Sequence, residues 1–237
     1  MSKHKWFWTL CSLALILTMI PMESFAASLS QNYDALEKTQ KINENEQFMK
    51  ENVSSIWEQC EEGTIPATVE TAYMEGADGT KIPFQVYSYR ESVYSDDQSV
   101  VYADNKVWEV PLAQAGTSTS TRPHADDPLY GSTTLYYELF QEGYTRYFRV
   151  VKGSGNYSIT DSAFSVIDQH VFIKQFGAGS PTMVSEVFEA NPTGTSWAYN
   201  TGFTGKVLDT GDMMLQIKWT FTVKRQSTFT CEFDHQY

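Results

Sequence analysis

Two patterns of apolar positions divide the chain into a helical N-terminal part and a β-rich remainder. At about 100° per residue, the apolar positions of residues 42–60 fall on one narrow face of a helix. They are Ile42, Met49, Val53, Ile56 and Cys60, with Trp57 at the edge. From residue 63 onward, short runs of Val, Ile, Thr, Tyr and Phe alternate with turn residues, which is typical of strands. The sequence predicts a helical segment over residues 28–62 and an antiparallel β domain over residues 63–237.

Within the helical segment, the apolar face changes sides. The apolar positions before residue 38 lie opposite the stripe that begins at Ile42, so we expect two helices, or one broken helix, with the change near Lys38–Lys41. A partly disordered polar leader over residues 30–46 is the alternative, because Asn43–Gln47 is almost entirely polar. Gly63 suits the end of the helix, where a left-handed residue is common.

The strand signals are regularly spaced. Asp78-Gly79 marks one hairpin, because glycine supplies the positive φ angle that a tight turn needs. The clearest ribbon is Leu215–Val223, in which apolar and polar residues alternate strictly, followed by a return over Thr228–Phe233. We count roughly ten strands, spaced as in a sandwich or barrel. The predicted fold class is mainly β: an antiparallel β-sandwich, with a barrel-like closure as the alternative, preceded by a helical segment.

The first 27 residues have the pattern of a secretory signal peptide. Lys3 and Lys5 precede the apolar run Leu10–Ile20, and Ser24 and Ala26 place small residues at a cleavage site. The apolar run is shorter than the roughly 20 residues that a membrane span needs. We therefore expect a secreted, extracellular protein that retains no membrane span after removal of the signal. The pattern favours a bacterial source, with eukaryotic secretion as the alternative.

The charge of the chain limits the classes of molecule that it is expected to bind. The chain has 29 acidic and 17 basic residues, a formal net charge of −12. This charge argues against nucleic acid and against an anionic membrane surface, because both bind clustered Lys and Arg. The expected partner is an extracellular glycan or protein. The sequence does not indicate the oligomeric state.

Cysteine usage adds one structural prediction. Removal of the signal takes Cys11 with it and leaves Cys60 and Cys231, an even number in an oxidising compartment. Cys60 lies on the apolar helix stripe, and Cys231 alternates with polar neighbours in the last ribbon, so both should face inward. We expect a disulfide between them, which would tie the helix to the last strand.

Candidate chemistry is sparse. His124, Asp126 and Asp127 are weak candidates for metal ligands, and an acidic turn in an exposed loop explains them equally well. No cofactor-binding motif and no catalytic motif is evident, so we name no catalytic residue. Aromatic side chains exposed on a sheet stack on sugar rings or form contact patches. The candidates for such a contact are Trp108, Trp197 and Tyr199, with core packing as the competing interpretation.

These observations favour a secreted, non-enzymatic binding or interaction module whose ligand the sequence does not identify. The first alternative is a hydrolase that uses a pair of carboxylates, as glycoside hydrolases do. The second is a membrane-active β protein, which the acidic charge makes the weakest of the three.

Overall fold

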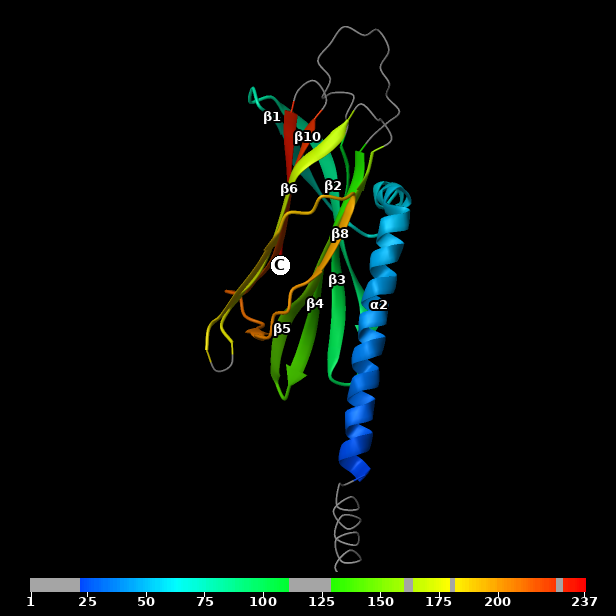
Figure 1. The fold of residues 1–237 in the computed structure, drawn as a ribbon, viewed down its shortest axis with the longest axis vertical. Coiled ribbons are helices and arrows are strands. Elements are labelled where there is room, and N and C mark those ends of the chain that lie inside the picture. The colour runs from blue at the N-terminus through cyan, green and yellow to red at the C-terminus, as the bar shows by residue number, and fades with distance from the viewer. Residues whose placement is uncertain (1–21, 111–128, 160–163, 180–181, 225–227) are drawn as a thin grey trace, which may run out of the picture. The chain divides into compact units, whose positions relative to one another are not determined.

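The structure is a computed structural model that describes residues 22–110, 129–159, 164–179, 182–224 and 228–237. It shows a long helix, α2 (Met22–Glu61), followed by antiparallel strands (Figure 1). The strands are β1 (Thr68–Gly76), β2 (Lys81–Ser95), β3 (Ser99–Val110), β4 (Leu129–Glu142), β5 (Thr145–Ser158), β6 (Ser165–Gly177), β7 (Val184–Ala190), β8 (Ser196–Asn200), β9 (Val207–Leu208), β10 (Met214–Lys224) and β11 (Thr228–Gln236). The prediction of a mainly β, antiparallel fold with an N-terminal helix is confirmed.

All the strands belong to a single sheet that curls into a half-barrel. Their order is β7-β6-β10-β11-β1-β2-β3-β4-β5-β8, and β9 pairs with β5 outside this path. The curl brings the β6–β10 part of the sheet face to face with β5. Gly153 of β5 lies so close to this part that a Cβ on it would be 2.6 Å from the side chain of Ile173 in β6 and 2.8 Å from that of Ile217 in β10. The barrel-like alternative is therefore the one that the chain adopts.

The chain divides into two compact units at a point inside α2. The first ends at Lys41, and the second comprises residues 42–237. In the described part of the first unit, the side chains of Tyr33 and Leu36 are both 67% exposed. No helix in the described part of the chain is long and apolar enough to cross a membrane.

The break expected near Lys38–Lys41 is not present, because α2 is helical through these residues. Non-helical backbone angles occur instead at Asn52, where φ is −122° and ψ is 15°. The polar run that suggested a leader has polar partners on the sheet: Asn45 donates to Glu91 at 3.0 Å, and Lys152 of β5 donates to Asn43 at 2.8 Å. Polar residues in a helix remain ordered when the surface beneath them satisfies their hydrogen bonds.

The inner face of the half-barrel holds the main core, and aromatic rings dominate it. The alternation in β10 is confirmed, since its apolar side chains are buried while their neighbours are half-buried. Trp108 of β3 is fully buried and stacks on Phe233 of β11, with ring centroids 4.3 Å apart. Gly131 of β4 makes room for it, because a Cβ there would lie 2.0 Å from the Trp108 ring. The inner face thus joins strands from both halves of the chain.

The outer face of the sheet packs against the part of α2 that begins at Ile42. The apolar helix stripe is buried as predicted, and Met49 and Ile56 are each only 1% exposed. The C-terminal part of the stripe packs with Tyr87 and Val107, and Ile42 packs farther along the same face. The helix side of the sheet is therefore a second, smaller core.

The predicted disulfide is wrong, and the two cores explain why. Cys60 lies in the cluster between α2 and the outer face, whereas Cys231 lies in the cluster on the inner face. Both are buried, as expected, but the sheet separates them, and both are free thiols. Burial raises the pKa of the Cys231 thiol to about 12 and also raises the pKa of Cys60.

Candidate functional site

The aromatic residues proposed as ligand contacts lie in or beside the core. Trp108 is 0% exposed and Trp197 is 6% exposed. Tyr199 is half-buried, stacks on Trp197 with ring centroids 5.7 Å apart, and contacts Phe188 at 5.2 Å. The structure thus shows these rings packed against protein, and their contact with a ligand stays a prediction.

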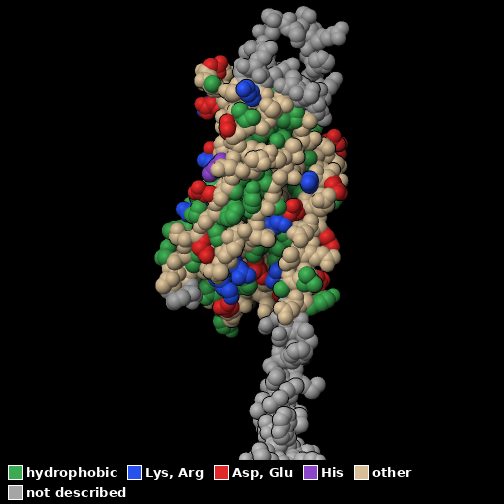
Figure 2. Space-filling model, viewed as in Figure 1, with side chains coloured by type: hydrophobic (Ala, Val, Ile, Leu, Met, Phe, Trp, Pro, Cys, Tyr) green, Lys and Arg blue, Asp and Glu red, His purple; other side chains and the backbone are tan. Residues whose placement is uncertain are grey.

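Phe188 and Tyr199 belong to the two edge strands, β7 and β8, and their rings contact each other. Backbone contacts also link the two arms of the sheet, since Leu208 of β9 donates to Ala178, just after β6, at 2.7 Å. Figure 2 shows hydrophobic side chains gathered in the middle of the face that is also seen in Figure 1. The candidate metal ligands His124, Asp126 and Asp127 lie outside the described residues. Within the described ranges, no group of three or more His, Cys, Asp or Glu side chains is arranged to hold a metal ion.

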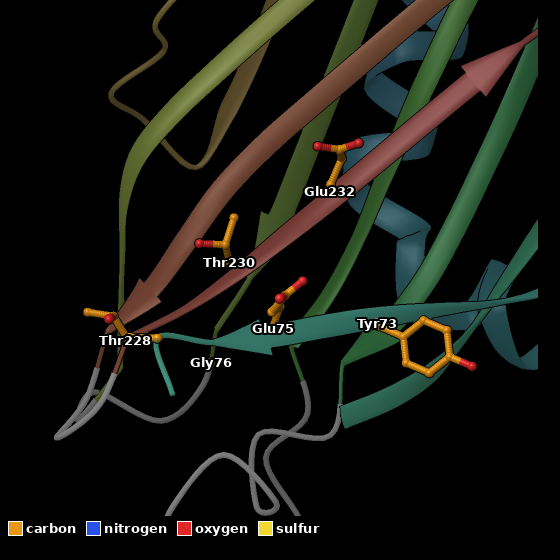
Figure 3. A pocket seen from close by; sticks show the side chains of 7 residues that line it. Tyr73, Glu75, Gly76, Thr228, Thr230 and Glu232 are labelled. Carbon is orange, nitrogen blue, oxygen red and sulfur yellow. The ribbon is translucent and has the colours of Figure 1, made fainter. Parts of the chain in front are cut away.

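A hollow of about 430 Å³ lies on the outer face of β1 and β11. We refer to it as the outer hollow. Its lining residues are Tyr73, Glu75, Gly76, Ala77, Thr228, Thr230 and Glu232. Figure 3 shows the side chains of Tyr73, Glu75, Thr230 and Glu232 along the two neighbouring strands. This size is within the range of small-molecule sites in proteins.

Strand alternation places these side chains together. Met74 pairs with Cys231 and Glu75 with Thr230 across the β1–β11 ladder. Met74 and Cys231 are fully buried in the inner core, so their neighbours in sequence point to the outer face. Tyr73, at 52% exposed, is an aromatic side chain on the side of the ribbon that faces water.

The turn after β1 forms one rim of the outer hollow. Asp78 accepts a hydrogen bond from the Thr80 backbone at 3.0 Å, and Gly79 adopts a φ of 83°, as the Asp-Gly signal indicates. Hydrogen bonds from the backbone and the side chain of Thr80 lower the pKa of the Asp78 carboxyl. The Ala77 backbone donates to Thr228 at 3.3 Å, which fixes the turn against the start of β11.

The two carboxylates of the outer hollow form ion pairs at its sides. Glu75 lies 3.7 Å from Lys81, and Glu232 lies 2.8 Å from Lys218. More than half of each glutamate side chain is exposed, at 57% and 52%. Exposed pairs of this kind contribute roughly 0–1 kcal/mol to stability, so the lysines compete only weakly with a ligand for these carboxylates.

A second group of charged residues lies on the inner face: Glu70, Arg90, Asp104, Lys106 and His235. We refer to it as the inner charge cluster. Arg90 donates to both oxygens of Asp104, at 2.5 and 2.9 Å, and Lys106 donates to Glu70 at 2.5 Å. His235 Nε2 lies 3.9 Å from the Asp104 carboxylate. Although burial opposes its charge, the hydrogen bonds to Asp104 raise the pKa of Arg90.

His235 is the most strongly perturbed member of the inner charge cluster. It is 9% exposed, and its Nδ1 has no hydrogen-bond partner among the described residues. Burial, together with the positive charges of Lys106 and Arg90, lowers its pKa to about 3. His235 is therefore neutral at neutral pH. The rings of Tyr137 and Tyr237 cover the Arg90 guanidinium at 5.5 and 4.4 Å, while 41% of the Arg90 side chain and 55% of the Glu70 side chain remain exposed.

Sequence reasoning did not single out either group. The residues of the outer hollow come from strands at opposite ends of the β domain, and no local motif connects them. The one available signal was the position of Tyr73, on the polar side of its strand between Ala72 and Met74. Comparison with known proteins adds no candidate, because no family model, no curated protein and no solved structure matches this chain.

Proposed function

We propose that this protein is an exported, non-enzymatic binding module and that it holds a glycan in the outer hollow. The observation that carries the proposal is a single hollow lined by an exposed tyrosine, Tyr73, at one end and by hydroxyl and carboxylate groups of the neighbouring strand, Thr230 and Glu232 (Figure 3). The signal-peptide pattern of residues 1–27 supports an extracellular site of action.

Each side chain suits a different part of a sugar. The apolar face of a pyranose ring packs against an aromatic ring, which Tyr73 offers. Carboxylate oxygens accept two hydrogen bonds from neighbouring sugar hydroxyls, and charge-assisted bonds of this kind are stronger than neutral ones. Threonine hydroxyls both donate and accept, so Thr228 and Thr230 suit the remaining sugar hydroxyls.

The strands beneath the outer hollow support a preorganised site. β11 pairs with β10 on one side and with β1 on the other, and β1 pairs in turn with β2. The inward neighbours of the lining residues, Met74 and Cys231, are fully buried. Side chains on such a backbone need little ordering when a ligand binds, which reduces the entropic cost of binding.

A glycan array probed with the purified protein, followed by calorimetric titration of the glycans that bind, tests the proposal. We expect Tyr73→Ala to weaken binding about tenfold, because stacking on the ring is lost. Tyr144→Ala is the matched control, since Tyr144 is fully exposed but lies outside the outer hollow. Absence of binding to any glycan, or equal loss in both variants, would refute the proposal.

The presence of Glu75 and Glu232 in one hollow also favours a second candidate, a glycoside hydrolase that uses this pair. The general acid of such an enzyme needs a raised pKa, which burial supplies. Both side chains are more than half exposed, so binding is the better-supported function. Release of reducing ends from a bound oligosaccharide, abolished in Glu75→Gln, would instead establish the hydrolase.

A further inference from the structure

The charge of the outer hollow distinguishes among the sugars that it would accept. The described residues that line it include two glutamates and no Lys, Arg or His. Asp78 adds a third carboxylate at the rim, since one of its oxygens would lie 2.7 Å from a Cβ built on Gly76, itself a lining residue. Lys81 and Lys218 offset two of these three negative charges and leave one net negative charge, so a cationic ligand would be favoured over an anionic one.

The ion pairs of Glu75 and Glu232 with lysines leave one oxygen of each carboxylate for a ligand. Lys81 approaches Oε2 of Glu75, and Lys218 approaches Oε1 of Glu232. Oε1 of Glu75 and Oε2 of Glu232 are not engaged by these pairs. A carboxylate accepts hydrogen bonds at both oxygens, so each glutamate can bind a further donor without losing its lysine.

Tyr73 adds a second means of attracting a cation. The face of an aromatic ring carries partial negative charge and attracts an ammonium group positioned above it. The ring is 52% exposed and lines the same hollow as the carboxylates. The ring lies at one end of the hollow and the glutamates lie further along it, so both ends attract an ammonium group (Figure 3).

We propose that the outer hollow selects amino sugars whose amine is free and protonated, and that it discriminates against the corresponding N-acetylated sugars. The selectivity comes from Glu75, Glu232 and the face of Tyr73. The hydroxyls of Thr228 and Thr230 favour a sugar over a lysine side chain, because only the sugar has hydroxyls next to the amine. This inference rests on the proposed glycan-binding function and concerns the same hollow.

Acetylation removes the charge of the amine and two of its donors, so the two forms of one sugar chain make a matched pair of probes. The experiment is calorimetric titration of the purified protein with glucosamine oligomers and with N-acetylglucosamine oligomers of the same length. We expect the free-amine form to bind about tenfold more tightly, with a preference that falls as salt is added or as the pH rises above the pKa of the sugar amine.

Two neutralising variants locate the preference. Glu232→Gln and Glu75→Gln should each reduce the preference several-fold, because loss of the negative charge weakens binding of the free-amine form more than binding of the acetylated form. Glu189→Gln is the control, since Glu189 is a similarly exposed glutamate on β7, outside the outer hollow. Thermal melts of all three variants should match that of the unmodified protein, because these side chains are exposed.

The outcomes separate the two proposals. Equal or tighter binding of the acetylated oligomer, with binding still lost in Tyr73→Ala, overturns the amine preference and leaves the glycan function standing. Binding of oligolysine as tightly as of glucosamine oligomers overturns the preference for a sugar. Failure of every glycan to bind refutes the proposed function itself.

Discussion

The buried, neutral His235 should make the fold sensitive to mild acid. Its pKa is lowered from an ordinary value of 6.5 to about 3. Above pH 6.5 the histidine is neutral in both the folded and the unfolded chain and has no effect on the balance between them. Below pH 6.5, His235 becomes protonated in the unfolded chain but stays neutral in the folded chain until about pH 3. The free energy of unfolding therefore falls as the pH falls through this interval.

The magnitude follows from the size of the window. Each pKa unit is worth about 1.4 kcal/mol, so two units below pH 6.5 remove about 3 kcal/mol from the free energy of unfolding. Urea unfolding followed by tryptophan fluorescence from pH 7 to about pH 4.5 measures this loss. Other groups titrate in the same range, so the informative quantity is the difference between the protein and His235→Gln at each pH.

That difference should shift by about 3 kcal/mol across the window in favour of the variant. His170→Gln is the matched control, because His170 lies on β6 with a side chain that is 47% exposed. A difference between the protein and His235→Gln that stays constant from pH 7 to about pH 4.5 would refute the reasoning, since it would mean that His235 titrates alike in both states.

Three further predictions test the packing. Gly131→Ala should destabilise the fold by about 3 kcal/mol or more, because the new methyl would overlap the Trp108 ring, whereas Gly211→Ala has open space around it; chemical denaturation compares the two. Met49→Ala should cost about 2–5 kcal/mol in the same assay and Phe48→Ala less than about 0.5, because Met49 is 1% and Phe48 53% exposed. Alkylation of the denatured, unreduced protein should label both described cysteines, and a disulfide-linked mass would contradict the placement of the two thiols on opposite faces of the sheet.

Local patterns were sufficient for the elements of this fold. Strict alternation in β10 follows from one buried and one half-exposed face, and the helix stripe from Ile42 to Cys60 follows from a single contact surface. The break in α2 was misplaced because a change in the apolar face shows where apolar residues lie and not where the backbone bends. The polar leader was considered because the sequence cannot show that Asn43 and Asn45 would meet polar groups on the sheet.

The larger arrangement depends on pairing between distant segments. Nothing near Cys231 in the sequence indicates that it would lie opposite Met74, and inward-facing positions on a sheet with two covered faces do not say which core a residue enters. For the same reason the outer hollow was missed: its residues acquire a common location only when β11 pairs with β1.

The position of β11 also bears on when this protein can fold. The last strand of the described chain lies inside the sheet, between β10 and β1, so the half-barrel lacks a central strand until this segment has joined. Contacts between residues so far apart in sequence form slowly, because closing a long loop costs conformational entropy before the pairing contributes favourable free energy. Under the export proposed above, this delay would be useful, because a chain whose sheet is still incomplete can pass through a translocation channel unfolded.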